Sequence, residues 1–444
     1  STRELVYGFI AYSQSTWVVQ WFGNFYDSQI SIKDKRIIGK DSCNTEQINL
    51  FISDDIINVH NDIVDSLWNK KAFDVKLKRL RHLIHLVYPN LIGGYDPYLE
   101  IIMPNMEYDE CQIIHENKKI YAKVKLTGGQ LDHFNTERRS LRVKSQKKIL
   151  NMDVFNLYHP KARLGGIYEW LGHMLLKNEG LAALKTGYVS ILINNNQKGL
   201  YFYQEHPTSN MLINNHLAPG LLFRLCLRDS LGNRVVNYDA NNTRLTVRKF
   251  YDKSNLKKTI DFKQQKLILE NSLEKFNNKQ IPLDSLISIE KLSKFSAIIN
   301  LTNGYHATRL GNCYFYLNPK TLLIEPVGRE FATNFYEPSW EFRFKPPYYL
   351  KEKSMKIDNV LAVFYPYGLD TVTLKKYENI FINDLKRVSN KSYLDNIFSL
   401  YYEELNQRQY CLFKADESFK KFKKDHYYTN QHLIQNYIKE ITDK

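Results

Sequence analysis

Tyr188-Val-Ser-Ile-Leu-Ile-Asn194 and Gly199-Leu-Tyr-Phe-Tyr-Gln-Glu205 decide the expected fold, because they read as two strands joined by a polar turn. The apolar residues of the first strand are nearly continuous, which favours a buried central strand. The second strand starts at a glycine and ends on the carboxylate of Glu205. A carboxylate that closes a buried hairpin needs a basic group or a metal as its partner. A structural arginine would be such a partner, so the flanking sequence must distinguish the alternatives.

The composition is that of a folded protein. The chain has 444 residues, of which 43% are hydrophobic and 25% charged, enough for one large domain or two to three ordinary ones. The 31 tyrosines and 24 phenylalanines favour sheet-rich packing. No apolar run approaches the roughly 18 residues of a transmembrane helix, so no transmembrane segment is expected. The five cysteines are far apart and form no Cys-x-x-Cys pair, which argues against a disulfide framework or a zinc site.

The net charge of +15, with a pI near 9.2, favours anionic partners such as nucleotides, phosphorylated surfaces, acidic proteins or nucleic acid. The densest basic runs are Lys70–Arg81, Arg138–Lys148 and Lys414–Lys424. Such a run usually marks a solvated helix face, and no helix-turn-helix, zinc-finger or RNA-binding signature accompanies these three. Nucleic acid is therefore an unlikely partner on charge alone.

Two regions follow from the pattern of elements. Residues 1–95 form an N-terminal accessory piece of small α/β type, with a strand over 7–25 and helices over 45–68 and 76–88. Residues 96–444 form the main domain, with a polar insertion at about 239–280. The main domain ends in a helical, lysine-rich layer that begins near Asp370.

A glycine pair lies in the first part of the main domain. Strands over 98–103 and 118–126 lead into Gly128 and Gly129, whose backbone amides can approach an anion closely, although most glycine pairs are only turns. Arg142 and Lys144 follow, and being two residues apart they share one face of a strand. Their position directly after the glycines favours phosphate binding.

Three further elements complete the sequence pattern. A helix over 162–184 carries Glu169 and His173 four residues apart, an arrangement more often found at a surface than at a metal. A helix over 281–301 has Asp284 placed as its cap. A hairpin over 312–326 follows and leads into Val-Gly-Arg-Glu330.

In this order of elements, the chain from about Tyr98 to its end resembles the CotH family of spore-coat-type protein kinases. The matching features are the glycine loop at 128–129, the strand ending at Lys144, the hairpin ending at Glu205, the segment ending at Arg224 and the hairpin over 312–326. The resemblance implies an α+β, divergent protein-kinase-like fold with a mixed or antiparallel sheet and a C-terminal helical layer. The accessory piece lies outside it.

The resemblance also implies ATP as cofactor, held between the glycine loop and basic side chains. Arg142 or Lys144 would contact the phosphates, and Glu205 would be the buried partner of that base. Arg224 stands where the family usually has a lysine, and its guanidinium can still bind phosphate in a fork.

The chain departs from the family where the catalytic and metal-binding aspartates are expected. The first place reads Asn300-Leu-Thr-Asn-Gly-Tyr-His306, and the second reads Val-Gly-Arg-Glu330. Glu330 is then the candidate metal ligand and catalytic acid, His306 the candidate proton acceptor, and Asn312 a second oxygen ligand for magnesium or manganese. Losing metal carboxylates removes a central contribution to phosphoryl transfer.

Three hypotheses remain open. The chain is an atypical CotH-like kinase, or a related ATP-dependent transferase, acting on a protein or surface-layer component. Alternatively, it is a pseudokinase scaffold in the assembly of a coat, surface layer or polysaccharide. A basic module that binds nucleic acid or acidic polysaccharide rests on charge alone. The resemblance favours an extracytoplasmic or cell-envelope location.

Overall fold

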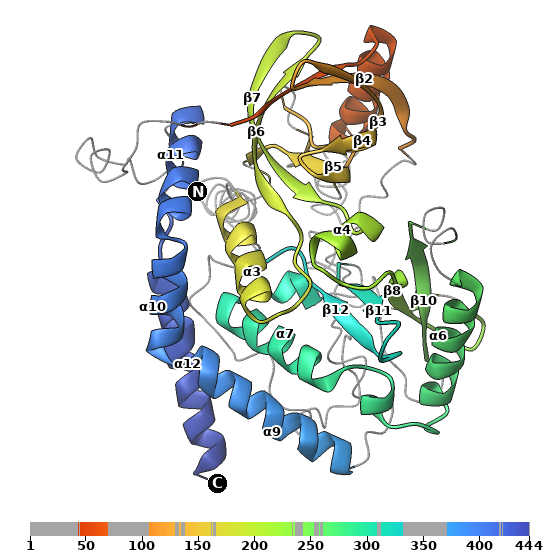
Figure 1. Cartoon of the computed structure of the whole chain (residues 1–444), viewed down its shortest axis with the longest axis vertical. Coiled ribbons are helices and arrows are strands. Elements are labelled where there is room, and N and C mark those ends of the chain that lie inside the picture. Colours follow the sequence, from red (N-terminus) through yellow and green to blue (C-terminus); the bar gives the residue numbers. More distant parts are fainter. Residues whose placement is uncertain are drawn as a thin grey trace, which may run out of the picture. The chain divides into compact units, whose positions relative to one another are not determined.

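The chain is described here by a computed structural model (Figure 1). It describes residues 43, 45–69, 106–128, 133–134, 138–160, 162, 166–232, 234–235, 243–252, 257, 261–308, 312–331, 371–416, 419 and 421–443. These residues belong to two compact units. The barrel unit comprises Asn44–Arg163 and Thr186–His206, and the helical unit comprises Ser1–Cys43, Leu164–Lys185 and Pro207–Lys444.

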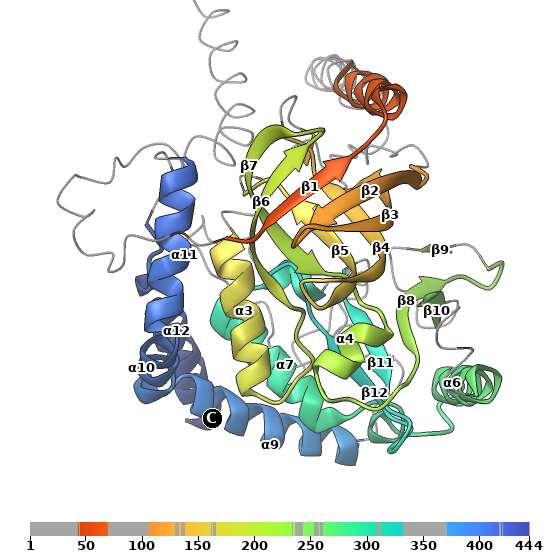
Figure 2. The same ribbon diagram turned by 45° about the horizontal axis from the view of Figure 1, so that its top comes forward.

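The barrel unit is a closed barrel of seven strands in the order β1-β2-β3-β4-β5-β7-β6. The strands are β1 (Gln47–Phe51), β2 (Asp109–His115), β3 (Lys118–Leu126), β4 (Leu141–Ile149), β5 (Met152–Tyr158), β6 (Thr186–Ile193) and β7 (Asn196–Glu205). All neighbours are antiparallel except β1 and β6, which run parallel and close the barrel, as Figure 2 shows. Alternate residues such as Leu50, Val124, Val143 and Phe155 are fully buried inside it.

The hairpin predicted from Tyr188 to Glu205 is confirmed as β6 and β7. Its turn is formed by Asn194 and Asn195, whose φ angles are 51° and 62°. Asparagine tolerates this left-handed conformation, which a two-residue hairpin turn requires at both central positions. The local pattern therefore determined the hairpin correctly.

The predicted kinase-like fold is wrong. A closed seven-stranded barrel, with a second sheet and helices in the other unit, does not match a bilobal kinase-like fold with a sheet lobe. The strand that closes the barrel, β1, was expected to be part of a helix over 45–68. Ile48 and Leu50 alternate as buried residues of β1, and the helix begins after Ser53 and is described over 54–69.

The helical unit contains a second sheet in the order β10-β8-β11-β12, with β9 beside β8. The strands are β8 (Leu222–Arg228), β9 (Arg234–Val235), β10 (Arg244–Tyr251), β11 (Tyr314–Leu317) and β12 (Ile324–Val327). β11 and β12 form the hairpin that the sequence predicted. One face of the sheet packs beside the short helix α4 (Ser209–Asn214), with Met211, Leu212, Leu222 and Tyr314 in one buried cluster.

The remaining helices belong to the same unit. They are α3 (Ile167–Asn178), α6 (Phe262–Asn277), α7 (Ile289–Thr302), α9 (Thr371–Val388), α10 (Lys391–Leu400), α11 (Tyr402–Ala415) and α12 (Asp425–Thr442), with the 3-10 turns η5 (Leu283–Ser285) and η6 (Tyr305–Thr308). α7 packs against α9 and α12; Ser293 donates to Asp384 of α9 at 2.6 Å, and Asn430 of α12 donates to the backbone carbonyl of Leu301 at 2.9 Å. Ser288 caps α7 by accepting from the backbone of Lys291, so the predicted cap at Asp284 is wrong; Asp284 pairs with Lys376 at 3.0 Å.

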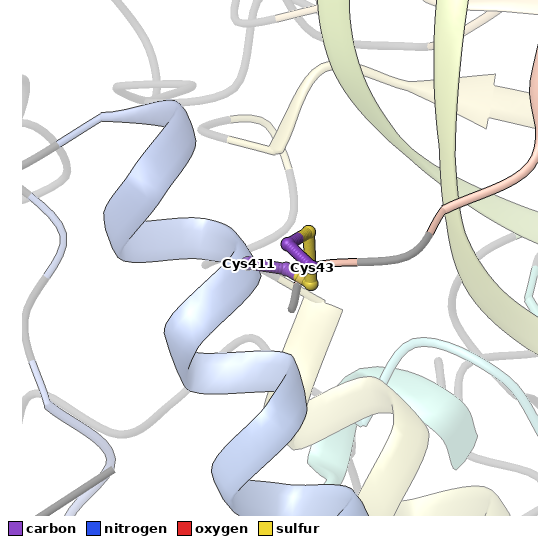
Figure 3. The surroundings of a disulfide bond; sticks show 2 residues. All are labelled: Cys43 and Cys411. Carbon is purple, nitrogen blue, oxygen red and sulfur yellow. A yellow bond between two sulfur atoms is a disulfide. The ribbon is translucent and has the colours of Figure 1, made fainter. Parts of the chain in front are cut away.

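A disulfide joins Cys43 to Cys411 in α11 (Figure 3). Its two cysteines are 368 residues apart, so the cysteine spacing contains no signal for this bond. Cys111, Cys226 and Cys313 are free and buried. Among the described helices, none combines the length and apolar character needed to cross a membrane.

Candidate functional site

A row of side chains crosses the second sheet from β10 through β8 to β11. Lys249 lies directly opposite Arg224 in the strand register. Arg224 in turn donates from Nη2 to the hydroxyl of Tyr314, at 2.7 Å. Two cations opposite each other on neighbouring strands repel, so the pattern is unfavourable for the sheet alone.

Two arginines converge on the hydroxyl of Tyr314. Arg329, just after β12, donates to it from Nη1 at 3.1 Å, beside the bond from Arg224. The guanidinium carbons lie 4.3 Å (Arg224) and 5.7 Å (Arg329) from the centroid of the tyrosine ring. Tyr314 thus acts as a neutral hydrogen-bond acceptor and a cation–π partner for both arginines.

Glu330 supplies one carboxylate to the group. Its Oε1 lies 2.6 Å from Nη2 of Arg329, and both side chains are largely buried. We call Lys249, Arg224, Tyr314, Arg329 and Glu330 the Tyr314 cluster. Three cations against one carboxylate leave it with an excess of two positive charges. The Nε of Arg224 is buried and has no hydrogen-bond partner among the described residues.

Burial perturbs the ionisable groups around the cluster. Tyr251 stacks edge-to-face on Tyr314, with ring centroids 4.9 Å apart. Burial is the largest cause that raises the pKa of Tyr251, and the neighbouring Arg224 and Arg329 oppose the rise. Burial also raises the pKa of the Cys313 thiol to about 12. Both groups are therefore neutral at physiological pH and add no negative charge to the cluster.

A buried carboxylate on α3 holds the backbone that carries Arg329 and Glu330. The two oxygens of Glu169 accept from the backbone N–H groups of Glu330 and Phe331, each at 2.7 Å. Glu330 has a φ of 69°, a left-handed conformation that is unfavourable for a non-glycine residue. The bonds to Glu169 hold this conformation in place.

His173 supports Glu169 from the next turn of α3. Its Nε2 lies 3.4 Å from the carboxylate, and its Nδ1 accepts from the backbone N–H of Leu184 at 3.2 Å. Because Nδ1 is an acceptor, the proton of the neutral ring is assigned to Nε2, facing Glu169. Both side chains are 0% exposed, so the expectation that Glu169 and His173 form a surface pair is wrong.

The close approach of α3 to this segment depends on Gly172. A Cβ atom at this position would lie 2.4 Å from Cγ of the Phe331 ring. The ring of Phe331 also contacts His173, with centroids 5.4 Å apart. A larger residue at position 172 would therefore require the Phe331 side chain to shift.

Arg224 and Glu330 are the two predicted site residues that the structure joins, through Tyr314 and Arg329. The side chain of His306 lies outside the described part of the molecule, although its backbone belongs to η6. Asn312 is described and half-buried. Their proposed roles remain predictions. Within the described residues, no group of three or more His, Cys, Asp or Glu side chains is placed to hold a metal ion.

Arg142, Lys144 and Glu205 all lie in the barrel unit, where the strand register assigns Glu205 to the opposite face of the sheet from the two cations. Residues that face each other across strands point to the same side of a sheet. Glu205 lies opposite Phe155, which lies opposite Val143, and both of these fill the barrel. Arg142 and Lys144 alternate with Val143 and point outward, on the other face of β4. The register thus does not place Glu205 as the partner of either cation.

Gly128 has a packing role in the barrel unit. Its φ is 124°, and a Cβ atom there would lie 2.2 Å from Cγ of His133. His133 in turn contacts the hydroxyl of Ser140 through Nδ1, at 3.0 Å. The glycine therefore makes room for a buried histidine. Gly129, its predicted partner in phosphate binding, lies outside the described residues.

Lys249, Tyr314 and Arg329 are the members of the cluster that sequence reasoning missed. Tyr314 and Tyr316 alternate along β11, a pattern that is consistent with a shared face but indicates no ligand. Arg329 was read only as part of the altered metal segment. Its convergence with Arg224 depends on pairing between β8 and β11, which local sequence does not encode.

Comparison with known proteins provides no family for this chain. No protein-family model matches the sequence, and a search of the curated proteins finds no match. The resemblance to CotH kinases therefore remains a prediction from the sequence.

Proposed function

We propose that the Tyr314 cluster binds the phosphate groups of a nucleotide such as ATP, and that the chain is an ATP-dependent transferase. The observation that carries this is the convergence of Arg224 and Arg329 on one neutral hydroxyl. Two guanidinium groups so close together repel each other, and an anion between them would relieve that repulsion.

The chemistry of the cluster favours phosphate over other anions. Guanidinium groups present several N–H donors in a fixed fork, which matches the oxygens of phosphate. Lys249 is exposed, and Arg224 is half-buried. A ligand that approaches from this side would meet two cations before it reaches Arg329.

The transfer step and its acceptor rest on the sequence resemblance. It implies magnesium or manganese with ATP, and a protein or surface-layer component as acceptor. The Cys43–Cys411 disulfide supports an oxidising compartment, which agrees with an extracytoplasmic or cell-envelope location.

A second candidate function is a nucleotide-binding scaffold without transfer activity. The carboxylate of Glu330 is paired with Arg329, and it belongs to no group of three or more His, Cys, Asp or Glu side chains placed to hold a metal within the described residues. Such a protein would act in the assembly of a coat, surface layer or polysaccharide. It would bind nucleotide through the same arginines and transfer nothing.

Calorimetry with ATP, with and without magnesium, tests the proposal. We expect Arg224→Gln and Arg329→Gln each to weaken ATP binding by about tenfold or more, because each removes a charge-assisted contact. Arg244→Gln, an exposed arginine of β10, is the control and should bind as the parent does. Equal affinity in all four proteins, or no binding at millimolar ATP, would refute the proposed site.

Label transfer separates the two functions. Incubation with ATP labelled at the γ-phosphate should label an acceptor if the chain is a transferase, and Glu330→Gln should reduce the rate. Binding without transfer to any acceptor in a cell-envelope extract would favour the scaffold.

A further inference from the structure

The outer face of the β3–β4 hairpin in the barrel unit carries a concentration of positive charge. The two strands contain eight lysines and arginines and no aspartate or glutamate. Alternation along the strands places Lys119, Tyr121, Lys123 and Lys125 of β3, with Arg142 and Lys144 of β4, on the outside, while the residues between them fill the barrel. We call these six residues the basic face.

The strand register brings like charges together on this face. Lys123 lies directly opposite Lys144, and Lys125 lies directly opposite Arg142. Like charges in opposed positions of an antiparallel pair destabilise the sheet. Two adjacent pairs of this kind are therefore a cost to folding that an anionic ligand would offset.

Among the partners of the basic face, Glu110 is exposed, and Asn156, the carbonyl of Met106 and the ring of Tyr108 are neutral. Glu110 of β2 reaches Lys123 at 3.4 Å, but the side chain of Glu110 is 87% exposed and that of Lys123 is 53% exposed. Such an exposed pair contributes little. Arg142 is held by Asn156 at 2.8 Å, a neutral partner that orients the guanidinium without cancelling its charge.

Tyr121 stands among these cations as an exposed aromatic ring. Tyr121 is 65% exposed, compared with 48% for Tyr402 and 41% for Trp68. The ring lies between Lys119 and Lys123 on the outward side of β3. Exposed aromatics flanked by cations on a barrel are the arrangement with which proteins stack unpaired bases while they track the phosphate backbone.

We propose that the basic face binds single-stranded nucleic acid, with phosphates on the lysines and one base stacked on Tyr121. Successive outward residues of a strand are about 6.6 Å apart, and neighbouring strands are about 4.8 Å apart. The face therefore offers a grid of cations rather than one pocket, which suits a polyanion. Recognition would be largely independent of sequence, because every base has a ring face to stack.

This site is distinct from the Tyr314 cluster, which lies in the other unit. The proposal of nucleic-acid binding is therefore independent of the proposal that the Tyr314 cluster binds a nucleotide. The sequence hypothesis of a basic binding module rested on total charge. The barrel structure now shows which cations lie opposite each other, that they share one face, and that Tyr121 is exposed among them.

Fluorescence anisotropy of the full chain with a labelled oligothymidine tests the proposal. The oligothymidine should be longer than the roughly 4–16 nucleotides that one OB-fold barrel covers. Tyr121→Ala should weaken binding by about 5- to 150-fold without changing the salt dependence, and Tyr121→Phe should restore it, because the ring supplies the stacking. Lys123→Gln with Lys144→Gln should lower the slope of log K against log salt by about 1.4, since two phosphate contacts are lost.

Lys263→Gln with Lys275→Gln is the matched control. Both lysines are exposed on α6 of the helical unit, so the pair removes the same charge elsewhere. It should leave affinity and salt slope nearly unchanged. Equal weakening by the two double variants would overturn the proposal, because only net charge would then matter.

Heparin, measured separately as a labelled ligand, distinguishes an acidic polysaccharide. Binding of heparin with no binding of oligothymidine at low salt would overturn the proposal and assign the face to polysaccharide. An unchanged oligothymidine affinity in Tyr121→Ala would also overturn it, because stacking would play no part.

Discussion

The hydroxyl of Tyr314 accepts hydrogen bonds from two guanidinium groups while its side chain is 1% exposed. A neutral acceptor satisfies donors without cancelling their charge, unlike a carboxylate. This one atom therefore keeps Arg224 and Arg329 together and leaves the cluster cationic. The ring beneath contributes further through cation–π attraction.

Tyr314→Phe tests this role. The variant keeps the ring and removes the shared acceptor, so two buried charged donors lose a partner. We expect the free energy of unfolding to fall by about 1–3 kcal/mol. Urea unfolding followed by circular dichroism measures the change, and calorimetry with ATP should show weaker binding because the arginines are no longer aligned.

Tyr316→Phe is the matched control on the same strand. The hydroxyl of Tyr316 donates to the backbone carbonyl of Ala218 at 2.6 Å and contacts neither arginine. This variant should lose stability but retain the parent affinity for ATP. If both variants lost ATP affinity equally, the special role of Tyr314 would be refuted.

At the residue scale, the sequence identified two side chains of the cluster but not the residues that they contact. Arg224 and Glu330 were predicted to share a site, and the structure joins them through two residues that were not predicted. Arg329 is adjacent to Glu330 but was not singled out. It lies close to Arg224 only because β8 pairs with β11, and Arg224 and Tyr314 are 90 residues apart in the chain. Glu205 was predicted from its position at the end of a hairpin. Its inward direction follows from barrel closure, which the hairpin alone does not reveal.

At the scale of elements, α3 fixes the segment that follows β12 through one carboxylate. Glu169→Gln keeps the size of the side chain but places an amide nitrogen where one of two backbone donors needs an acceptor. We expect the free energy of unfolding to fall by about 2–4 kcal/mol, since a buried backbone N–H is left unsatisfied. ATP affinity should also fall, because Arg329 lies on this segment. Denaturant unfolding and calorimetry measure the two effects.

Glu325→Gln provides the comparison for Glu169→Gln. Glu325 lies on β12 and accepts from Asn318 at 2.8 Å, but it is only half-buried and touches no backbone donor of residues 330–331. It should change stability by less than about 1 kcal/mol and leave binding intact. A mild effect of Glu169→Gln on both quantities would show that the segment holds its position without this carboxylate.

The two hairpins, β6–β7 and β11–β12, were predicted from the sequence, but the closure of the barrel was not. The turn at Asn194 and Asn195 is local, so the types of these two residues are enough to predict it. In contrast, Ile48, Phe51 and Ile52 fit helical spacing, whereas Ile48, Leu50 and Ile52 fit strand alternation, and only the parallel pairing of β1 with β6 resolves the ambiguity. That pairing joins residues about 140 positions apart. Long-range pairing of this kind is what overturned the kinase-like fold.

At the scale of the whole molecule, the Cys43–Cys411 disulfide restricts the unfolded chain more than any local contact. It joins residues 368 positions apart, and chain-entropy reasoning assigns such a loop a stabilisation of about 6 kcal/mol, of which measured values often recover only part. We expect Cys43→Ser with Cys411→Ser to lower the free energy of unfolding by about 2–5 kcal/mol. Thermal and urea unfolding measure the loss.

A reducing agent supplies the internal control. Dithiothreitol should lower the unfolding midpoint of the parent protein to that of the double variant and leave the variant unchanged. An equal effect of the reductant on both proteins would mean that another thiol determines the response.

Alkaline pH is expected to destabilise the chain through its buried tyrosines. Tyr168 of α3 contacts Phe422, with ring centroids 5.0 Å apart, and burial raises its pKa to about 12 from an ordinary value near 10. The native state therefore favours the neutral phenol, and this stabilisation is complete below pH 10 and is lost as the pH rises through 12. By pH 11 the free energy of unfolding of the parent should fall by about 1.4 kcal/mol because of this residue.

Tyr168→Phe should lose correspondingly less free energy of unfolding between pH 9 and 11, as measured by urea unfolding. Tyr402→Phe, at an exposed tyrosine, should follow the parent. Parallel pH profiles for Tyr168→Phe and the parent would show that Tyr168 does not contribute.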